Sequence, residues 1–253
     1  TDRHWSTNIS VEVDTEFWDK VQAKDPDATG VLRVIVNKML ANGEPGFFNS
    51  SLASEGERGD VRSTNPCGEI ALEDGEPCVL GHVNLAHWGT DVWGAREAAR
   101  LMTRFLIRAT FAEVTSDVTR AVLERNRRIG VGLFGVQEWA AEHGVRWSDI
   151  PSSRKLRMFL KNMVSEVETA AYDYSRLLGV VVPVKTRTIA PTGTIAKLPG
   201  VSEGIHPIYA KHFIQRVRYA STDVNIPDGY AKEDCLYSAN TTVVSIPTRN
   251  PIL

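Results

Sequence analysis
Apolar residues recur at the spacing of an α-helix in three long stretches of the chain. The first covers residues 31–40 and is followed by an Asn-Gly pair that favours a helix end. The second, from about residue 95 to 123, predicts one long helix or two consecutive ones. The third follows a capping serine, Ser152 or Ser153, and ends at Leu178-Gly179. It has the most regular stripe and is the clearest helix in the sequence.

Short alternating or β-branched segments between these helices predict strands. Residues 8–14 alternate in this way, and Asp14 or Thr15 then caps a short helix that carries Phe17, Trp18 and Val21. Further strands are expected at residues 180–184, 186–189 and 241–246. Because strands alternate with long helices, the pattern favours an α/β architecture with a largely parallel sheet.

Other segments lack both periodicities. Residues 49–64 are polar and glycine-rich and predict a loop, and a turn is expected at residues 44–46. The segment 127–135, Arg-Arg-Ile-Gly-Val-Gly-Leu-Phe-Gly, contains three glycines, which indicates close backbone packing rather than a free loop. A helix resumes at residues 136–141.

Composition narrows the class of protein. The 253 residues are 42% hydrophobic and 24% charged, with a net charge of −2, as in an ordinary globular protein. Basic and acidic residues are nearly equal in number, whereas a protein that binds a nucleic-acid polymer usually has an excess of basic residues. Binding to such a polymer is therefore not expected. No apolar run approaches the roughly 20 residues that span a bilayer, so a membrane protein is not expected. Three scattered cysteines favour a reducing compartment, the cytoplasm, over a disulfide scaffold.

The most informative stretch is Asn65-Pro66-Cys67-Gly68-Glu69, with Cys78 eleven residues after Cys67. Pro66 fixes φ and Gly68 permits close approach, which predicts that Cys67 lies at the tip of a tight finger. In an extended segment Asn65 and Glu69 would point the same way. A thiol, an amide and a carboxylate would then converge, a trio that suits radical chemistry on a hydroxylated substrate.

Plainer readings of the same residues stay open at this point. A cysteine in a turn is often only a small buried hydrophobe. A zinc site can be drawn from Cys67, Cys78, His82 and His87, but the gap between the cysteines is far from the usual spacing of structural zinc ligands. Cys67 and Cys78 could instead form a disulfide if they share one pocket.

Three ordered motifs give a resemblance to a known family. Asn65 to Ile70 followed by Cys78-Val79-Leu80-Gly81-His82-Val83-Asn84-Leu85 resembles the finger loop and following strand of ribonucleotide reductase catalytic subunits, Asn-x-Cys-x-Glu and then Cys-Asn-Leu-Gly-x-x-Asn-Leu. Val79 departs from that pattern, but both cysteines are kept. Residues 127–132 resemble the family's Arg-Arg-Ile-Gly-Leu-Gly segment, and Ala190 to Ile195 resemble its phosphate-binding loop.

The spacing of the cysteines resembles the adenosylcobalamin-dependent class of this family. Residues 200–218 resemble the monomeric triphosphate-reducing branch, since His206-Pro207 stands where the diphosphate-reducing branch usually has Glu-Pro. The diphosphate branch remains the alternative. The resemblance implies a ten-stranded α/β barrel with the cysteine finger inside, of which residues 1–253 would be a partial domain lacking the N-terminal half and the C-terminal tail.

The resemblance also assigns roles. It makes Cys67 the thiyl radical that abstracts the ribose 3′ hydrogen, Glu69 the acceptor of the 3′ hydroxyl proton, and Asn65 the ligand of a ribose oxygen. Cys78 would be half of the reducing dithiol, with its partner upstream of this chain. The substrate phosphates would lie on Pro191, Thr192, Gly193, Thr194 and Ile195, with two hydroxyls and a helix start there as the local reason. No metal site is expected.

The remaining candidates are given ordinary roles. Cys235 is interpreted as structural, Arg127 and Arg128 as solvated or tied to carboxylates, and His82, His87 and His206 as packing residues. The implied partners are a ribonucleotide, a complementary N-terminal segment of the enzyme and a thioredoxin-like reductant. A catalytically silent interaction subunit and a glycyl-radical enzyme of the same barrel type are the competing hypotheses.

Overall fold
The structure is a computed structural model that describes residues 9–250. Contacts divide the chain into two compact units at the His206-Pro207 bond, and each is described by itself. Within the described residues, no helix is long and apolar enough to cross a membrane.

The first unit opens with a strand, two helices and a parallel strand. Strand β1 (Ser10–Val13) pairs in parallel with β2 (Gly46–Asn49), and helices α1 (Thr15–Gln22) and α2 (Pro26–Asn42) connect them. Asp14 caps α1 by accepting from the Phe17 amide at 2.7 Å, and Gly43 ends α2 at φ +83°, which confirms both predicted helix limits.

A second parallel pair forms the centre of the larger part of this unit. Strand β5 (Leu80–Asn84) lies beside β6 (Gly130–Phe134), and residue Arg187 extends the sheet by one parallel bridge to Val131. The connection from β5 to β6 contains α4 (Leu85–Trp88), α5 (Val92–Ala109) and α6 (Asp117–Asn126). The predicted stretch 95–123 is therefore two consecutive helices.

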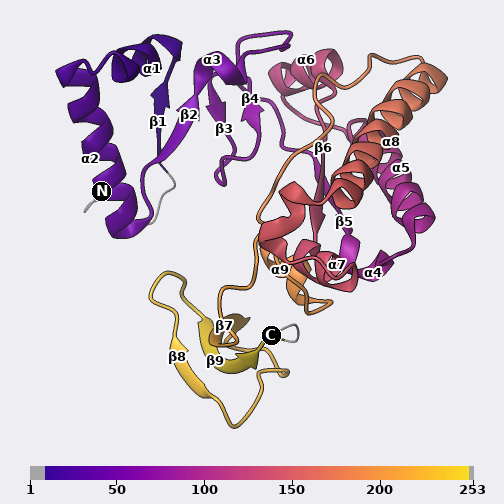
Figure 1. Cartoon of the computed structure of the whole chain (residues 1–253). Helices are drawn as coiled ribbons and strands as arrows, with labels where there is room; N and C mark the ends of the chain where they lie inside the picture. The colour runs from indigo at the N-terminus through magenta and orange to yellow at the C-terminus, as the bar shows by residue number, and fades with distance from the viewer. Residues whose placement is uncertain (1–8, 251–253) are drawn as a thin grey trace. The chain divides into compact units, whose positions relative to one another are not determined.

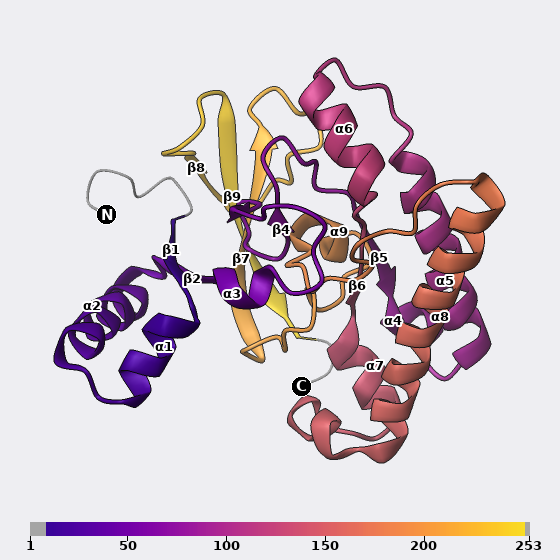
Figure 2. The same cartoon turned by 90° about the horizontal axis from the view of Figure 1, so that it is seen from above.

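Two long helices cover one face of this sheet. Helix α8 (Arg154–Leu178), which follows α7 (Val136–Glu142) and a short 3-10 turn at Trp147–Ser152, packs against α5, as Figures 1 and 2 both show. Ser153 and Gly179 cap α8 as predicted. The core between sheet and helices is apolar, with Trp139, Leu85, Leu106, Ile107 and Leu156 almost completely buried. Each such side chain contributes about 1.5–3 kcal/mol on burial.

Two local predictions are wrong. Residues 180–184 form no strand, because Pro183 lacks the N–H that a ladder needs; instead the Val184 amide donates to the Asn126 carbonyl. The loop predicted at residues 49–64 contains helix α3 (Ser50–Ala53) and strand β3 (Ser63–Thr64). The glycine segment supplies the buried strand β6, which confirms the predicted close packing.

The second unit is antiparallel, which corrects the expectation of a largely parallel sheet for this part. Strands β7 (His212–Ala220) and β8 (Ala231–Asp234) pair on either side of β9 (Thr241–Arg249). The parallel prediction holds for the β1–β2 and β5–β6 pairs. Residues 9–250 are thus an α/β fold plus a small antiparallel sheet, and they form no closed barrel.

Candidate active site
Cys67 lies in the turn of a short hairpin. Strands β3 and β4 (Ala71–Leu72) pair antiparallel, and the Gly68 amide donates to the Asn65 carbonyl at 2.9 Å to close the turn. Cys67 is exposed there. Gly68 has φ +80°, and a β-carbon at this position would meet no atom within 4 Å, so glycine is needed for its backbone conformation rather than for close approach.

Asn65 holds the turn together and reaches the second cysteine. Its side-chain oxygen accepts from the Ile70 amide at 3.1 Å, and its amide nitrogen donates to Cys78 Sγ at 3.6 Å. Residues 65–69 are therefore turned rather than extended, because this side chain replaces a ladder bond across the loop. The turn nevertheless brings the Asn65 amide to a cysteine thirteen residues away.

Glu69 is fixed through its backbone to the edge of the parallel sheet. The Thr188 hydroxyl donates to the Glu69 carbonyl at 2.8 Å. The Glu69 side chain is half-buried, and its Oε2 atom is buried with no hydrogen-bond partner in the described structure. The hairpin and the extended segment before Pro191 are thus directly connected.

The electrostatics of Cys78 link it to the other three residues. Removal of its sulfur from water raises the pKa of the Cys78 thiol, although the residue as a whole is exposed. The charge of Glu69 raises this pKa further, the Asn65 hydrogen bond lowers it, and Cys67 adds a smaller increase. The other three predicted residues therefore lie within electrostatic reach of the Cys78 sulfur.

The hairpin is seated on the face of the sheet opposite α5 and α8. A β-carbon at Gly130 would come within 3.1 Å of the Ile70 side chain and 2.4 Å of Leu80, so a larger residue would displace these side chains. Ile70 is buried there. The cysteine hairpin thus packs against β6 where the Arg-Arg-Ile-Gly-Val-Gly segment has its glycines.

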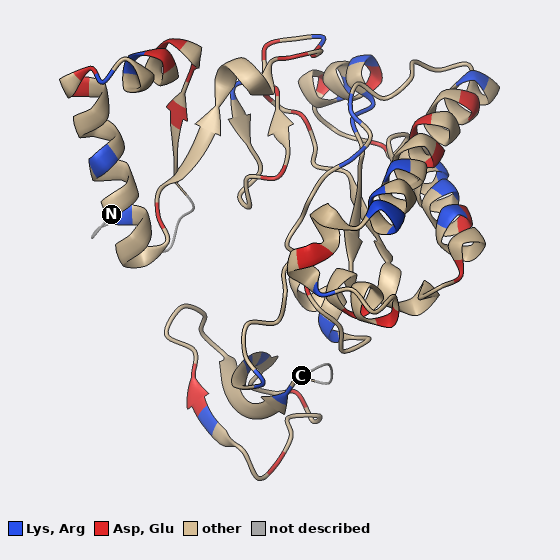
Figure 3. Ribbon diagram, in the orientation of Figure 1, with Lys and Arg blue, Asp and Glu red and all other residues tan. Residues whose placement is uncertain are grey.

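A buried charge network fixes the base of the hairpin. The Arg128 guanidinium binds both oxygens of Glu57, at 2.9 and 2.6 Å, and its Nε donates to Glu76 at 3.0 Å. These three side chains are at most 4% exposed. Burial opposes the charge of Arg128, but the two carboxylates outweigh it and raise its pKa. Figure 3 shows the basic positions where α6 leads into β6.

The same network holds the segment after β4. Asn126 donates to Glu73 at 2.5 Å and to Glu76 at 3.0 Å, and Arg125 donates to Glu73 at 2.5 Å. Burial disfavours ionised Glu73, but these hydrogen bonds outweigh it and lower the pKa of the carboxyl. Glu57 precedes β3 and Glu73 follows β4, so both ends of the hairpin are held by one cluster. The interpretation of Arg128 as tied to carboxylates is confirmed.

Arg127 has a different environment. It ends α6 at φ +43°, its guanidinium lies 4.4 Å from the centre of the Phe111 ring, and Nη1 donates to the Thr110 hydroxyl at 2.8 Å. Burial lowers its pKa. Arg127 is therefore a packing residue, held by an aromatic ring and a hydroxyl, rather than a solvated one.

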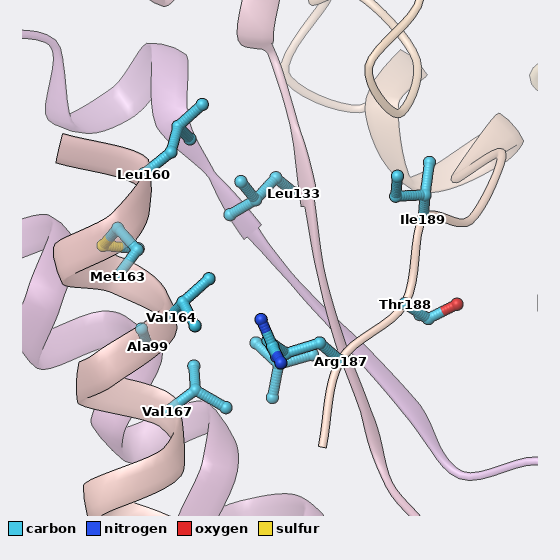
Figure 4. A pocket seen from close by; sticks show the side chains of 10 residues that line it. Ala99, Leu133, Leu160, Met163, Val164, Val167, Arg187, Thr188 and Ile189 are labelled. Atoms are coloured by element: carbon cyan, nitrogen blue, oxygen red, sulfur yellow. The ribbon is translucent and has the colours of Figure 1, made fainter. Parts of the chain in front are cut away.

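An apolar cavity of about 360 Å³ lies on the opposite face of β6. Val131 and Leu133 line it together with Met163, Val164 and Val167 of α8. Figure 4 shows that the Thr188 hydroxyl points away from α8 while Arg187 points toward it. The Thr188 hydroxyl binds the hairpin. The cavity and the cysteine hairpin therefore lie on opposite sides of the layer formed by β6 and the segment around Thr188. The cavity is not the thiol site.

The predicted phosphate loop begins helix α9 (Gly193–Lys197). Thr192 has φ +56° and is buried, with its hydroxyl oxygen accepting from the Gly204 amide at 2.8 Å. The Gly193 amide donates to Pro191 and the Ile195 amide to Thr192. Pro191, Thr194 and Ile195 are exposed. Two of the amides offered to a phosphate are thus engaged within the loop, and the Thr194 side chain is open to solvent.

The structure shows no metal-binding cluster among the described residues. Among residues 9–250, no group of three or more His, Cys, Asp or Glu side chains could hold a metal ion, so the zinc alternative has no support. Cys235 lies in the second unit, half-buried, and its amide donates to the Thr241 carbonyl at 2.8 Å. The three cysteines are free thiols.

The residues that support the site carry little signal in the sequence. Thr188 is predicted only as part of a strand, and nothing local marks Glu57, Glu73 and Glu76, because their partners are about fifty or more residues away. The Arg-Arg pair beside glycines is the one local signal of such a cluster.

Comparison with known proteins shows the family to which the chain belongs. Residues 8–180 match the family described as "Ribonucleotide reductase, barrel domain". With its cysteine hairpin seated on a parallel strand pair, the chain belongs to the ribonucleotide reductase family.

Two relatives are named as adenosylcobalamin-dependent ribonucleoside-triphosphate reductases. The chain is 48% identical, over 99% of its length, to the putative adenosylcobalamin-dependent ribonucleoside-triphosphate reductase of Mycobacterium phage D29. It is 36% identical over 97% of its length to the adenosylcobalamin-dependent ribonucleoside-triphosphate reductase of Lactobacillus acidophilus. It spans 39% and 36% of these two relatives. A crystal structure of a B12-dependent class II ribonucleotide reductase matches 97% of this chain and 37% of its own, with TM-score 0.69 and 31% identity.

Proposed function
We propose that this chain carries the radical site of an adenosylcobalamin-dependent ribonucleoside-triphosphate reductase. The observation that carries the proposal is the hydrogen bond from Asn65 to Cys78 Sγ across the turn that presents Cys67. It joins a redox thiol, an amide and an exposed thiol in one small region. The proposed setting is the ten-stranded family barrel, to which the β1–β2 and β5–β6 pairs would contribute strands.

The proposed chemistry assigns each residue one task. Cys67, as a thiyl radical, takes the hydrogen atom from C3′ of the ribose and later returns it. Glu69 accepts the 3′ hydroxyl proton, and Asn65 holds a ribose oxygen while the 2′ hydroxyl leaves as water. Two electrons and two hydrogens come from the thiols of Cys78 and a second cysteine, which become a disulfide. One hydrogen leaves with the 2′ hydroxyl as water, and the other takes the place of that hydroxyl at C2′. The second thiol is proposed to belong to a part of the family protein that this chain does not span.

The relatives are named as adenosylcobalamin-dependent, and the exposed Cys67 is compatible with this cofactor. When bound, adenosylcobalamin supplies the organic radical that starts the reaction. Cys67 is exposed in the turn, as a thiol must be if a separate group is to oxidise it. The phosphates are proposed to lie at Pro191–Ile195, with the exposed Thr194 as the side-chain donor. A thioredoxin-like reductant in the cytoplasm would restore the dithiol.

A chimeric enzyme tests the proposal. This chain replaces the matching region of the Lactobacillus acidophilus relative, and deoxynucleotide formation is measured with adenosylcobalamin, a dithiol and a ribonucleoside triphosphate. We expect product, and a loss of at least about 10³-fold in Cys67→Ser. Cys235→Ser is the matched control and should retain activity. Equal product from Cys67→Ser and the parent chimera would favour the silent-subunit hypothesis.

A further inference from the structure
His82 lies on the same face of β5 as the cysteine hairpin. Its neighbours Gly81 and Val83 point to the helices, since a side chain at Gly81 would meet Met102 and Leu106, and Val83 is part of the apolar core. Successive residues of a strand point to opposite faces. The His82 ring is therefore directed to the face on which Ile70 and Glu69 are seated.

Gly132 provides the space for this ring. His82 and Gly132 are paired across the two strands, and a side chain at Gly132 would lie 2.5 Å from His82 Cδ2 and 2.9 Å from Nε2. The same position is 3.4 Å from the Thr188 carbonyl oxygen. Thr188 is the residue whose hydroxyl holds the Glu69 backbone. Thr188 is therefore close to both residues: its hydroxyl binds the Glu69 backbone, and its carbonyl lies near the space that the His82 ring occupies.

Each of the two side chains leaves one polar atom unused. Glu69 Oε2 and His82 Nε2 are both buried, and neither has a hydrogen-bond partner in the described structure. Leaving a buried polar atom unpaired destabilises the folded state. An imidazole N–H and a carboxylate oxygen can satisfy each other, and the charge of Glu69 acts on the His82 ring.

The charges agree with such a pair. Burial lowers the pKa of His82, and the charge of Glu69 raises it by a smaller amount. The ring is therefore neutral at pH 7 and can donate a hydrogen bond without cancelling the carboxylate charge. Glu69 is the charged group that acts on His82, and the same carboxylate acts on Cys78. Arg187 points to α8 and binds Glu168.

We propose that His82 is a positioning residue: its Nε2–H donates to Glu69 Oε2 and aims the other carboxylate oxygen at the substrate hydroxyl. This inference rests on the proposed function for the role of Glu69. The pairing itself needs no nucleotide or cofactor and is tested separately.

Nitrogen NMR of the His82 ring in the 253-residue chain tests the pairing. We expect the Nε2–H tautomer and a further fall of the His82 pKa in Glu69→Gln, because the charge that raises it is removed. Asp149→Asn, an exposed carboxylate at the 3-10 turn, is the control and should leave the titration unchanged. An Nδ1–H tautomer, or a His82 pKa unaltered by Glu69→Gln, would overturn the proposal.

The chimeric enzyme tests the positioning role. His82→Gln keeps a side-chain N–H and should retain activity within about threefold of the parent, whereas His82→Leu should lower kcat by about 10-fold or more with little change in KM. His87→Gln, at an exposed position, is the matched control. Equal kcat values for His82→Leu and His82→Gln would overturn the role. An inactive parent chimera would instead count against the proposed function, while the NMR result would still decide the pairing.

Discussion
The Asn65 side chain donates to the sulfur of Cys78 at 3.6 Å while its oxygen accepts from the Ile70 amide. One residue thus shapes the turn of the first cysteine and stabilises the thiolate of the second. Asn65→Ala removes both contacts. We expect the Cys78 pKa to rise, and alkylation of Cys78 by iodoacetamide at about pH 7.5 to slow by about threefold.

Cys235 provides the internal standard in that measurement. It lies in the other unit, so its alkylation rate should be the same in both proteins. A Cys78 rate that is unchanged relative to Cys235 would contradict the role given to Asn65.

The charge of Glu69 acts on Cys78 in the opposite sense. Since Glu69 raises the Cys78 pKa, Glu69→Gln should lower it and speed alkylation of Cys78 at about pH 7.5 by about threefold. Mass spectrometry of the separately labelled cysteines measures the rates. Slower alkylation would show that the glutamine changes the loop rather than the charge.

Arg128 is the cation on which the base of the hairpin depends. Arg128→Met leaves Glu57 and Glu76 buried without their partner, and loss of one member of a buried pair costs about 3–5 kcal/mol. Chemical unfolding measures the change. Arg187→Met is the control, because its partner Glu168 is about half exposed and the pair should contribute less than about 1 kcal/mol.

Glu166 joins α8 to α5 through Arg96 and Arg100, at 2.8 and 2.5 Å. Burial works against its charge, but both guanidinium groups outweigh it and lower its pKa below the ordinary value of 4.5. This stability is therefore present above that value and lost as pH falls through the lower, folded-state pKa.

Glu166→Gln should make the protein less stable at pH 7, by about 2 kcal/mol, with a smaller difference at about pH 3. Urea unfolding at both pH values checks this. A difference that grows on acidification would contradict the assignment.

Gly132 should not tolerate a side chain. Gly132→Ala forces the His82 ring away and should cost about 1–3 kcal/mol. Gly30→Ala is the matched control, since Gly30 lies within α2 with open space around it and the substitution should stabilise by about 0.5–1 kcal/mol. Thermal unfolding of both variants compares them.

Local signals are sufficient to predict the helices. Ser153, the apolar stripe and Gly179 all belong to one element, and the structure has α8 between them. Strands are harder to predict, because pairing decides them. Val180 to Val184 is β-branched but contains Pro183 and forms no strand. Gly130 to Phe134 shows only that its glycines allow close packing, and it forms a buried strand.

The candidate site also has features that neighbouring residues encode and features that depend on distant segments. The finger around Cys67 follows from Pro66 and Gly68, since a turn is encoded by neighbouring residues. The cluster of Arg128 with Glu57 and Glu76 spans distant segments, and surface and buried charges look alike in a sequence. The orientation of His82 depends on the register of β5 with β6, which no single strand specifies.

The shortness of β3 and β4 has a consequence for any attempt to isolate the cysteine loop. With two residues in each strand, a peptide cut from this region would lack Arg128 and Asn126, which hold its two ends together. In water, the free peptide should sample many conformations, and its cysteines should react like ordinary thiols. The geometry of the loop is a property of the scaffold around it, so grafting it elsewhere would require transplanting that anchorage as well.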